Sequence, residues 1–190
     1  MIANVMPFHG THVGGLGGLS IPEIDSDSKA LMDLAEGDSD DKTSKKVATI
    51  LAEIGQTSFK AKQFERAFAY YSAAASLGDF PDAEYNAARS LQEASKVAKA
   101  KDDLATAKEA ATDALAWFHA CVTTSNLTKS LDTKADAEKQ IGLLTAYISD
   151  LGKKDVNGKN GDDDKKKDGM SPMLGLGLGL GLIWLISRGK

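Results

Sequence analysis

The sequence has one cysteine, Cys121, and three histidines among its 190 residues. A single cysteine excludes an intramolecular disulfide and a zinc site made of several cysteines. Three histidines leave little for a histidine-rich site, so we predict neither a metal nor a cofactor. An excess of positive charge is missing too, because the formal net charge is −4. The chain as a whole is therefore not expected to bind nucleic acid.

Catalytic patterns are missing as well. No carboxylate pair with a histidine and no activated nucleophile stands out in the sequence. The glycine-rich residues 14–18 lack the lysine and the serine or threonine with which a phosphate-binding loop continues. We therefore predict that the protein is not an enzyme.

Charge divides the chain into three regions. Residues 1–42 carry 2 basic and 8 acidic side chains, residues 43–152 carry 13 and 14, and residues 153–190 carry 8 and 5. We expect residues 1–42 to be a flexible acidic N-terminal region, and they lack the positively charged start of a secretory signal. One short helix is predicted inside this region, with its N-cap at Ser28 and an apolar side made by Ala30, Leu31 and Leu34.

The middle region, residues 43–152, has the composition of helices. Alanine dominates it, Pro81 is its only proline, and no β-branched runs interrupt it. Apolar residues recur at the i, i+3, i+4, i+7 spacing of one helix face, which predicts an all-α domain of about five helices. Short loops favour antiparallel hairpins. The expected inward positions are Val47, Ile50, Leu51 and Ile54; Ala67, Phe68, Tyr71, Ala74 and Ala75; Ala87, Ala88, Leu91, Ala94, Val97 and Ala98; Leu104, Ala107, Ala111, Ala114, Leu115, Phe118, Cys121 and Val122; and Ala137, Ile141, Leu144, Ile148 and Leu151.

Residues 48–81 place large and small side chains at regular positions. Gly55 and Ala67 are small where we expect two helices to touch, and Phe64 and Tyr71 fill the volume beside them. Together with Leu51, Ile54 and Ala74, this spacing resembles one tetratricopeptide repeat, a 34-residue helix–turn–helix unit. The junction at residues 78–86 is similar to that of the related Sel1-like repeats. A degenerate second pair and a terminal capping helix would complete such an array, and a generic helical bundle is the alternative.

The resemblance implies that the domain binds a protein partner, either a peptide or a helix. In that family the first helix of each repeat lines a groove, and the corresponding positions here are Thr49, Ala52, Gln56, Phe59 and Lys60. Phe59 is the expected anchor, because an exposed aromatic side chain is typical of binding hot spots. The alternative for Phe59 is that it packs under the N-terminal segment.

The C-terminal region changes character at Met170. Residues 153–169 are charged and glycine-containing, which predicts a disordered linker. No charged residue occurs over the 18 residues 170–187, and a helix of that length spans about 27 Å against a hydrocarbon core of about 30 Å. We predict a single transmembrane anchor there, with Trp184 at interfacial depth and residues 188–190 as a basic tail.

Leucine and glycine alternate in the centre of the predicted anchor. On a helix, this alternation pairs Gly175 with Gly179 and Gly177 with Gly181, which permits close packing on another membrane helix and homo-oligomers. Lysines 159, 165, 166 and 167 precede the span, so the positive-inside bias keeps the N-terminal domain in the cytoplasm.

Two functions fit this layout. The first is a membrane-tethered helical-repeat adaptor that binds a partner through its groove. The alternative is a structural minor membrane protein of a membrane-containing virion or organelle, which assembles through its Gly-Leu helix.

Overall fold

The computed structural model describes residues 18–37 and 41–157. Within these ranges the protein is all-α, as predicted, and contains no strand. The chain forms two compact units, Met1–Asp155 and Val156–Lys190, and the second is described only at the last two residues of the final helix. The predicted transmembrane helix at residues 170–187 lies outside the described residues. The helices are α1 (Ser26–Gly37), α2 (Asp41–Lys60), α3 (Phe64–Ser76), α4 (Pro81–Ala100), α5 (Leu104–Thr128) and α6 (Leu131–Asn157).

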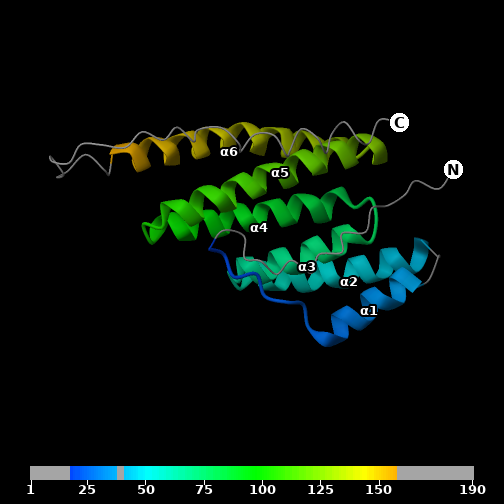
Figure 1. Cartoon of the computed structure of the whole chain (residues 1–190). Helices are drawn as coiled ribbons and strands as arrows, with labels where there is room; N and C mark the ends of the chain where they lie inside the picture. The colour runs from blue at the N-terminus through cyan, green and yellow to red at the C-terminus, as the bar shows by residue number, and fades with distance from the viewer. Residues whose placement is uncertain (1–17, 38–40, 158–190) are drawn as a thin grey trace, which may run out of the picture. The chain divides into compact units, whose positions relative to one another are not determined.

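From α1 to α5, consecutive helices are neighbours in space (Figure 1). α1 packs on α2, α2 on α3, and α3 on α4, while α4 and α5 share the largest interface. The pairs across that interface run in opposite directions: the Thr124 hydroxyl donates to Glu84 at 3.0 Å, and the Ser95 hydroxyl donates to the Ala107 carbonyl at 2.6 Å. The predicted antiparallel hairpin is therefore confirmed for α4 and α5.

Three connections share one backbone turn. Lys62, Asp102 and Lys129 have φ values of 59°, 60° and 61°, in the left-handed region. In each turn the amide of the next residue donates to the carbonyl five positions earlier, at distances between 2.9 and 3.1 Å. This is the Schellman pattern, which satisfies the last carbonyls of a helix. The α3–α4 connection differs, because Pro81 begins α4 at a position where its missing N–H costs no hydrogen bond.

Forty residues separate the start of α2 from the start of α4, and the start of α3 from that of α5. α2 and α4 each have 20 residues and end in the same turn. The buried positions of α2 recur in α4 at the same interval, so the two hairpins repeat one structural unit that is longer than the 34-residue unit of the resemblance. The paired positions are Val47 and Ala87, Ala48 and Ala88, Leu51 and Leu91, Gly55 and Ser95, and Ser58 and Ala98.

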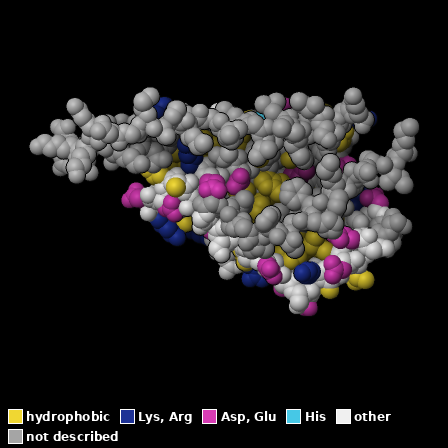
Figure 2. All heavy atoms as spheres, viewed as in Figure 1, with side chains coloured by type: hydrophobic (Ala, Val, Ile, Leu, Met, Phe, Trp, Pro, Cys, Tyr) yellow, Lys and Arg dark blue, Asp and Glu magenta, His cyan; other side chains and the backbone are white. Residues whose placement is uncertain are grey.

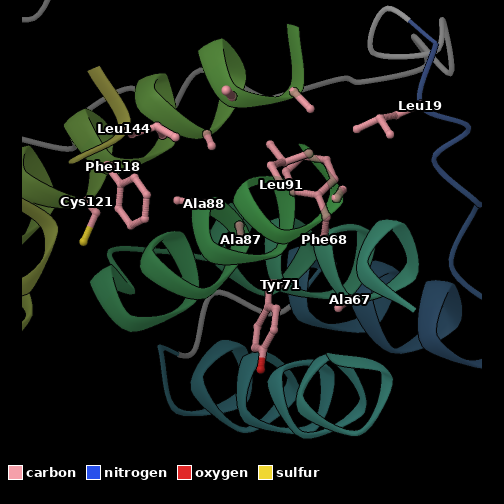
Figure 3. Close-up of a cluster of buried hydrophobic side chains, with 14 of the residues drawn as sticks. Leu19, Ala67, Phe68, Tyr71, Ala87, Ala88, Leu91, Phe118, Cys121 and Leu144 are labelled. Atoms are coloured by element: carbon pink, nitrogen blue, oxygen red, sulfur yellow. The ribbon is translucent and has the colours of Figure 1, made fainter. Parts of the chain in front are cut away.

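Small side chains let the helices of each hairpin touch at equivalent points. A Cβ added to Gly55 would lie 3.1 Å from the ring of Tyr71, whose ring lies between α3 and α2 (Figure 3). The equivalent of Gly55 in the second hairpin is Ser95, which contacts the backbone of α5 through its hydroxyl. The predicted helix contact at Gly55 is thus confirmed.

α6 runs parallel to α4. The residues that pair across the two helices rise together in number: Asp82 accepts from Thr133 at 2.7 Å, Gln92 donates to Gln140 at 3.3 Å, and the hydroxyls of Ser95 and Tyr147 lie 3.3 Å apart. All five inward positions predicted for this helix are buried or half-buried: Ala137, Ile141, Leu144, Ile148 and Leu151.

Three large hydrophobic residues predicted to face inward are exposed. Ile50 of α2 is 41% exposed, although Val47 and Leu51 are buried as predicted, because the rest of the buried face of α2 is made by Ala48, Gly55 and Ser58, which a hydrophobic pattern underweights. In α1, Leu34 is 66% exposed, whereas Ala35 is buried. Val97 of α4 is also outward, at 40% exposure.

The N-terminal segment, defined here as residues 18–25, packs on the helical body, which the sequence indicated only as the alternative for Phe59. Leu19 is 6% exposed and enters the cluster around Phe68 from this segment (Figure 3). Gly18 has a φ of 110° and approaches Thr106 so closely that an added Cβ would lie 2.3 Å from its hydroxyl oxygen. Glycine is required there both for its backbone conformation and for the missing side chain.

Asp25 links the N-terminal segment to α1 and α3. Its carboxylate accepts hydrogen bonds from the hydroxyl of Tyr70 and, at 2.9 Å, from the amide of Ser28. The bond from Tyr70, followed by that from the Ser28 amide, lowers the pKa of Asp25 from 3.8 to about 2. Asp25 rather than Ser28 therefore caps α1, and Ser28 is buried instead.

Gly55→Ala should destabilise the protein by about 1–3 kcal/mol, because the new methyl group would press on the Tyr71 ring. Gly142→Ala is the matched control, since a Cβ at Gly142 meets no atom within 4 Å and alanine favours helix by about 1 kcal/mol. Urea unfolding followed by circular dichroism measures both. A gain in stability of G55A as large as that of G142A would contradict the close contact.

Tyr70→Phe should lower the urea midpoint at neutral pH, because it removes a hydrogen bond to the ionised Asp25. The pKa of Asp25 is lowered in the folded state, so this stabilisation is present above the unfolded value of 3.8 and is lost as pH falls towards about 2. The difference between Y70F and the native protein should shrink over that interval. Tyr85→Phe serves as the control, and a difference that persists unchanged at low pH would contradict the Asp25 contact.

Candidate partner-binding groove

The residues predicted to line a groove occupy one side of α2. Thr49, Gln56 and Lys60 are exposed, and Ala52 and Phe59 are half-buried at the edge of the core-facing side. The structure therefore brings these five residues together on one helix, as their spacing required. No second helix is needed to place them.

Part of the Phe59 ring makes contacts within the protein. Its ring meets that of Phe64 edge to face, with 5.3 Å between the centroids. It also packs against the hydrophobic cluster that contains Leu19 and Phe68. Phe59 thus supports the connection between α2 and α3, and only part of its ring remains for a partner.

The forty-residue repeat carries the predicted positions from α2 onto α4. Thr49, Ala52 and Gln56 become Arg89, Gln92 and Lys96. These three residues line a groove between α4 and α6 with a volume of about 340 Å³. We call it the α4–α6 groove, and α6 completes it with Gln140, Leu143, Leu144 and Tyr147. The 34-residue unit of the resemblance did not indicate this groove, because that interval does not carry the α2 positions onto Arg89, Gln92 and Lys96.

Polar contacts hold the two walls of the α4–α6 groove together. Gln92 donates its side-chain amide to Gln140, and the Tyr147 hydroxyl lies 3.3 Å from Ser95 Oγ. The Lys99 ammonium lies 4.7 Å from the centroid of the Tyr147 ring, which is a cation–π distance. The groove is therefore a fixed feature of the fold rather than a gap between independent helices.

Positive charge exceeds negative charge among the α4 residues beside the groove. Glu93 is shared by two cations: its Oε1 lies 2.6 Å from Lys96 Nζ and 3.9 Å from Arg89 Nη2. Arg89 Nε is buried and has no hydrogen-bond acceptor in the part of the chain that the structure describes. An unpaired buried donor costs about 1–3 kcal/mol, so the fold alone does not explain Arg89.

A second hollow lies on the opposite flank of α2, against α3. It has a volume of about 400 Å³ and is lined by residues that include Ile50, Ile54, Glu53 and Arg66. The Arg66 guanidinium lies 5.7 Å from the centroid of the Tyr70 ring. None of the predicted groove residues lines this hollow.

Cys121, the one cysteine of the chain, lies inside the helical body. Cys121 is buried, its thiol donates to the Pro81 carbonyl at 3.3 Å, and burial raises its pKa to about 11. Among the described residues no three histidine, cysteine or carboxylate side chains converge to hold a metal ion. On the face shown in Figure 2, acidic and basic side chains are interspersed, with hydrophobic side chains visible between them.

No helix within residues 18–37 and 41–157 is long and apolar enough to cross a membrane. The predicted membrane-packing residues Gly175, Gly177, Gly179, Gly181 and Trp184 lie outside the described residues. Comparison of the chain with protein-family models, curated proteins and solved structures returns no match. The geometry and the sequence therefore carry the functional argument by themselves.

Arg89→Met should leave the free energy of unfolding within about 1 kcal/mol of the native value or raise it, because it removes an unpaired buried donor and keeps an unbranched stem. Arg66→Met, which removes the guanidinium over Tyr70, should cost about 0.5–1 kcal/mol. Urea unfolding of both variants tests this difference. A loss above about 2 kcal/mol in R89M would give Arg89 a structural role.

Proposed function

We propose that the protein is a membrane-tethered adaptor. Its helical domain binds a peptide or helix of a partner protein, and residues 170–187 hold that domain at the cytoplasmic side of a bilayer. The observation that carries the proposal is the repeated outward face of α2 and α4, which continues into the α4–α6 groove. The tandem helical hairpins support the resemblance to tetratricopeptide-like repeats without requiring the 34-residue unit.

The outward face has the mixed character of a protein-binding surface. Tyr147 and Leu143, which is 57% exposed, supply apolar area, while Arg89, Gln92 and Gln140 supply hydrogen-bonding groups. Tyrosine and arginine are enriched at binding hot spots. A groove of this size accepts a few side chains of a peptide, not a whole domain.

The membrane part of the proposal rests on the sequence of residues 170–187. Eighteen residues without a charge are close to the length that crosses a hydrocarbon core. The glycine pairs in this stretch also fit lateral assembly, as the alternative role of a structural membrane protein requires. The two roles differ in whether the groove or the glycine pairs are needed.

The full chain should sediment with liposomes and resist extraction at high pH, whereas a chain that ends at residue 168 should stay in the supernatant. Recovery of the full chain in the supernatant would contradict membrane tethering.

A photo-crosslinking amino acid at Leu143 should form adducts with another protein in cells that express the full chain, because this side chain faces the groove. Ser149, exposed and outside the groove lining, is the control position. Loss of assembly on replacing Gly175, Gly177, Gly179 and Gly181 by leucine, without any adduct at Leu143, would favour the structural role instead.

A further inference from the structure

We propose that the α4–α6 groove binds an acidic segment of the partner protein, in which two carboxylates flank an apolar side chain. This inference rests on the proposed function, because it names the chemistry of the partner that the groove takes. Three features of the groove support it: the charge of the lining, the unpaired donor of Arg89, and the spacing of the cations.

The lining of the groove carries positive charge only. Arg89 and Lys96 belong to it, and the other five lining residues, Gln92, Gln140, Leu143, Leu144 and Tyr147, are uncharged. Lys99 adds a third cation against Tyr147. Glu93, on the same helix, is the carboxylate that pairs with Arg89 and Lys96, so one negative charge serves two cations. A ligand with carboxylates complements this excess of positive charge.

Arg89 has donor capacity that the described fold does not use. Its Nε has no acceptor within the described residues, and its ion-pair contact with Glu93 is long, at 3.9 Å. A guanidinium binds a carboxylate through two parallel N–H groups, which can include Nε. A carboxylate in the groove would give the side chain the bidentate partner that Glu93 does not supply.

The spacing of the two cations sets the spacing of the ligand's carboxylates. Arg89 and Lys96 are seven residues apart on α4, which is about 10.5 Å along the helix axis. In an extended peptide, alternate side chains face the same way, so two glutamates four positions and about 13 Å apart can face the groove together with a leucine midway between them. The long side chains of the two cations cover the difference. The exposed Leu143 and the ring of Tyr147 lie on the α6 side of the lining, where an apolar side chain between the carboxylates can pack.

The hollow between α2 and α3 does not offer the same chemistry. Its lining contains both Glu53 and Arg66, so it has no excess of one sign. Arg66 is also engaged over the Tyr70 ring. Charge therefore separates the two hollows and selects the α4–α6 groove for an acidic ligand.

The test uses the full chain in detergent micelles and a fluorescent nine-residue peptide with two glutamates four positions apart and leucine midway between them. Matched peptides carry glutamine for both glutamates or serine for the leucine. Fluorescence anisotropy should show binding of the first peptide and at least about tenfold weaker binding of the other two. The double variant Arg89→Gln with Lys96→Gln should weaken the first peptide by a similar factor, and Leu143→Ser should weaken it several-fold.

The control variant is Lys45→Gln with Lys101→Gln, which removes the same charge from exposed positions outside the groove lining and should leave the affinity unchanged. Equal affinity for the glutamate and glutamine peptides would overturn the inference. A second result would also overturn it. In that result, a chain that ends at residue 168 binds phosphatidylserine vesicles through Arg89 and Lys96 but does not bind the peptide. Adducts from Leu143 in cells together with no acidic-peptide binding would leave the adaptor role standing and reject only the acidic partner.

Discussion

The fold depends on a close contact between paired helices that only small side chains allow. Gly55 lets α2 approach the Tyr71 ring of α3, and Ser95, forty residues later, joins α4 to the backbone of α5 at Ala107. These contacts fix the rotation of α2 and α4 about their axes. Once that rotation is fixed, the side chains left on the outside of α2 and α4 occupy equivalent positions. Each surface position of one hairpin therefore has a counterpart on the other, although the residue there can differ.

The two hairpins keep the same core and differ on their surfaces. The paired buried positions hold small or aliphatic side chains in both, whereas Thr49, Ala52 and Gln56 are replaced at the equivalent groove positions by Arg89, the buried Gln92 and Lys96. Burial explains the shared residues, because interiors tolerate little change in volume. It does not explain the cations of α4, one of which buries an unpaired donor. We propose that binding of a partner accounts for this difference between the repeats.

Much of the fold could be read from the sequence, and the errors have physical causes. The stripes of α5 and α6 were predicted correctly because large apolar residues such as Phe118 and Leu144 mark them. Val47 and Leu51 were placed inward correctly, whereas Ile50 was placed inward wrongly, because the rest of the inner face of α2 is made by Ala48, Gly55 and Ser58, whose burial depends on helix approach rather than hydrophobicity. Packing of the N-terminal segment was foreseen only as the alternative for Phe59, and its contacts through Leu19 and Asp25 were missed since they involve residues far along the chain. Predicting the α4–α6 groove requires the forty-residue interval between the hairpins. The predicted membrane residues lie outside the described part of the chain.

The proposed function depends on the placement of α6 beside α4, because these two helices form the groove. Nuclear Overhauser contacts from the ring protons of Tyr147 in the isotope-labelled protein test it most directly. We expect contacts from this ring to the side chains of Ser95 and Lys99, and a separate contact between the side chains of Gln92 and Gln140. Tyr147 contacts confined to α6 itself, with none to α4, would contradict it.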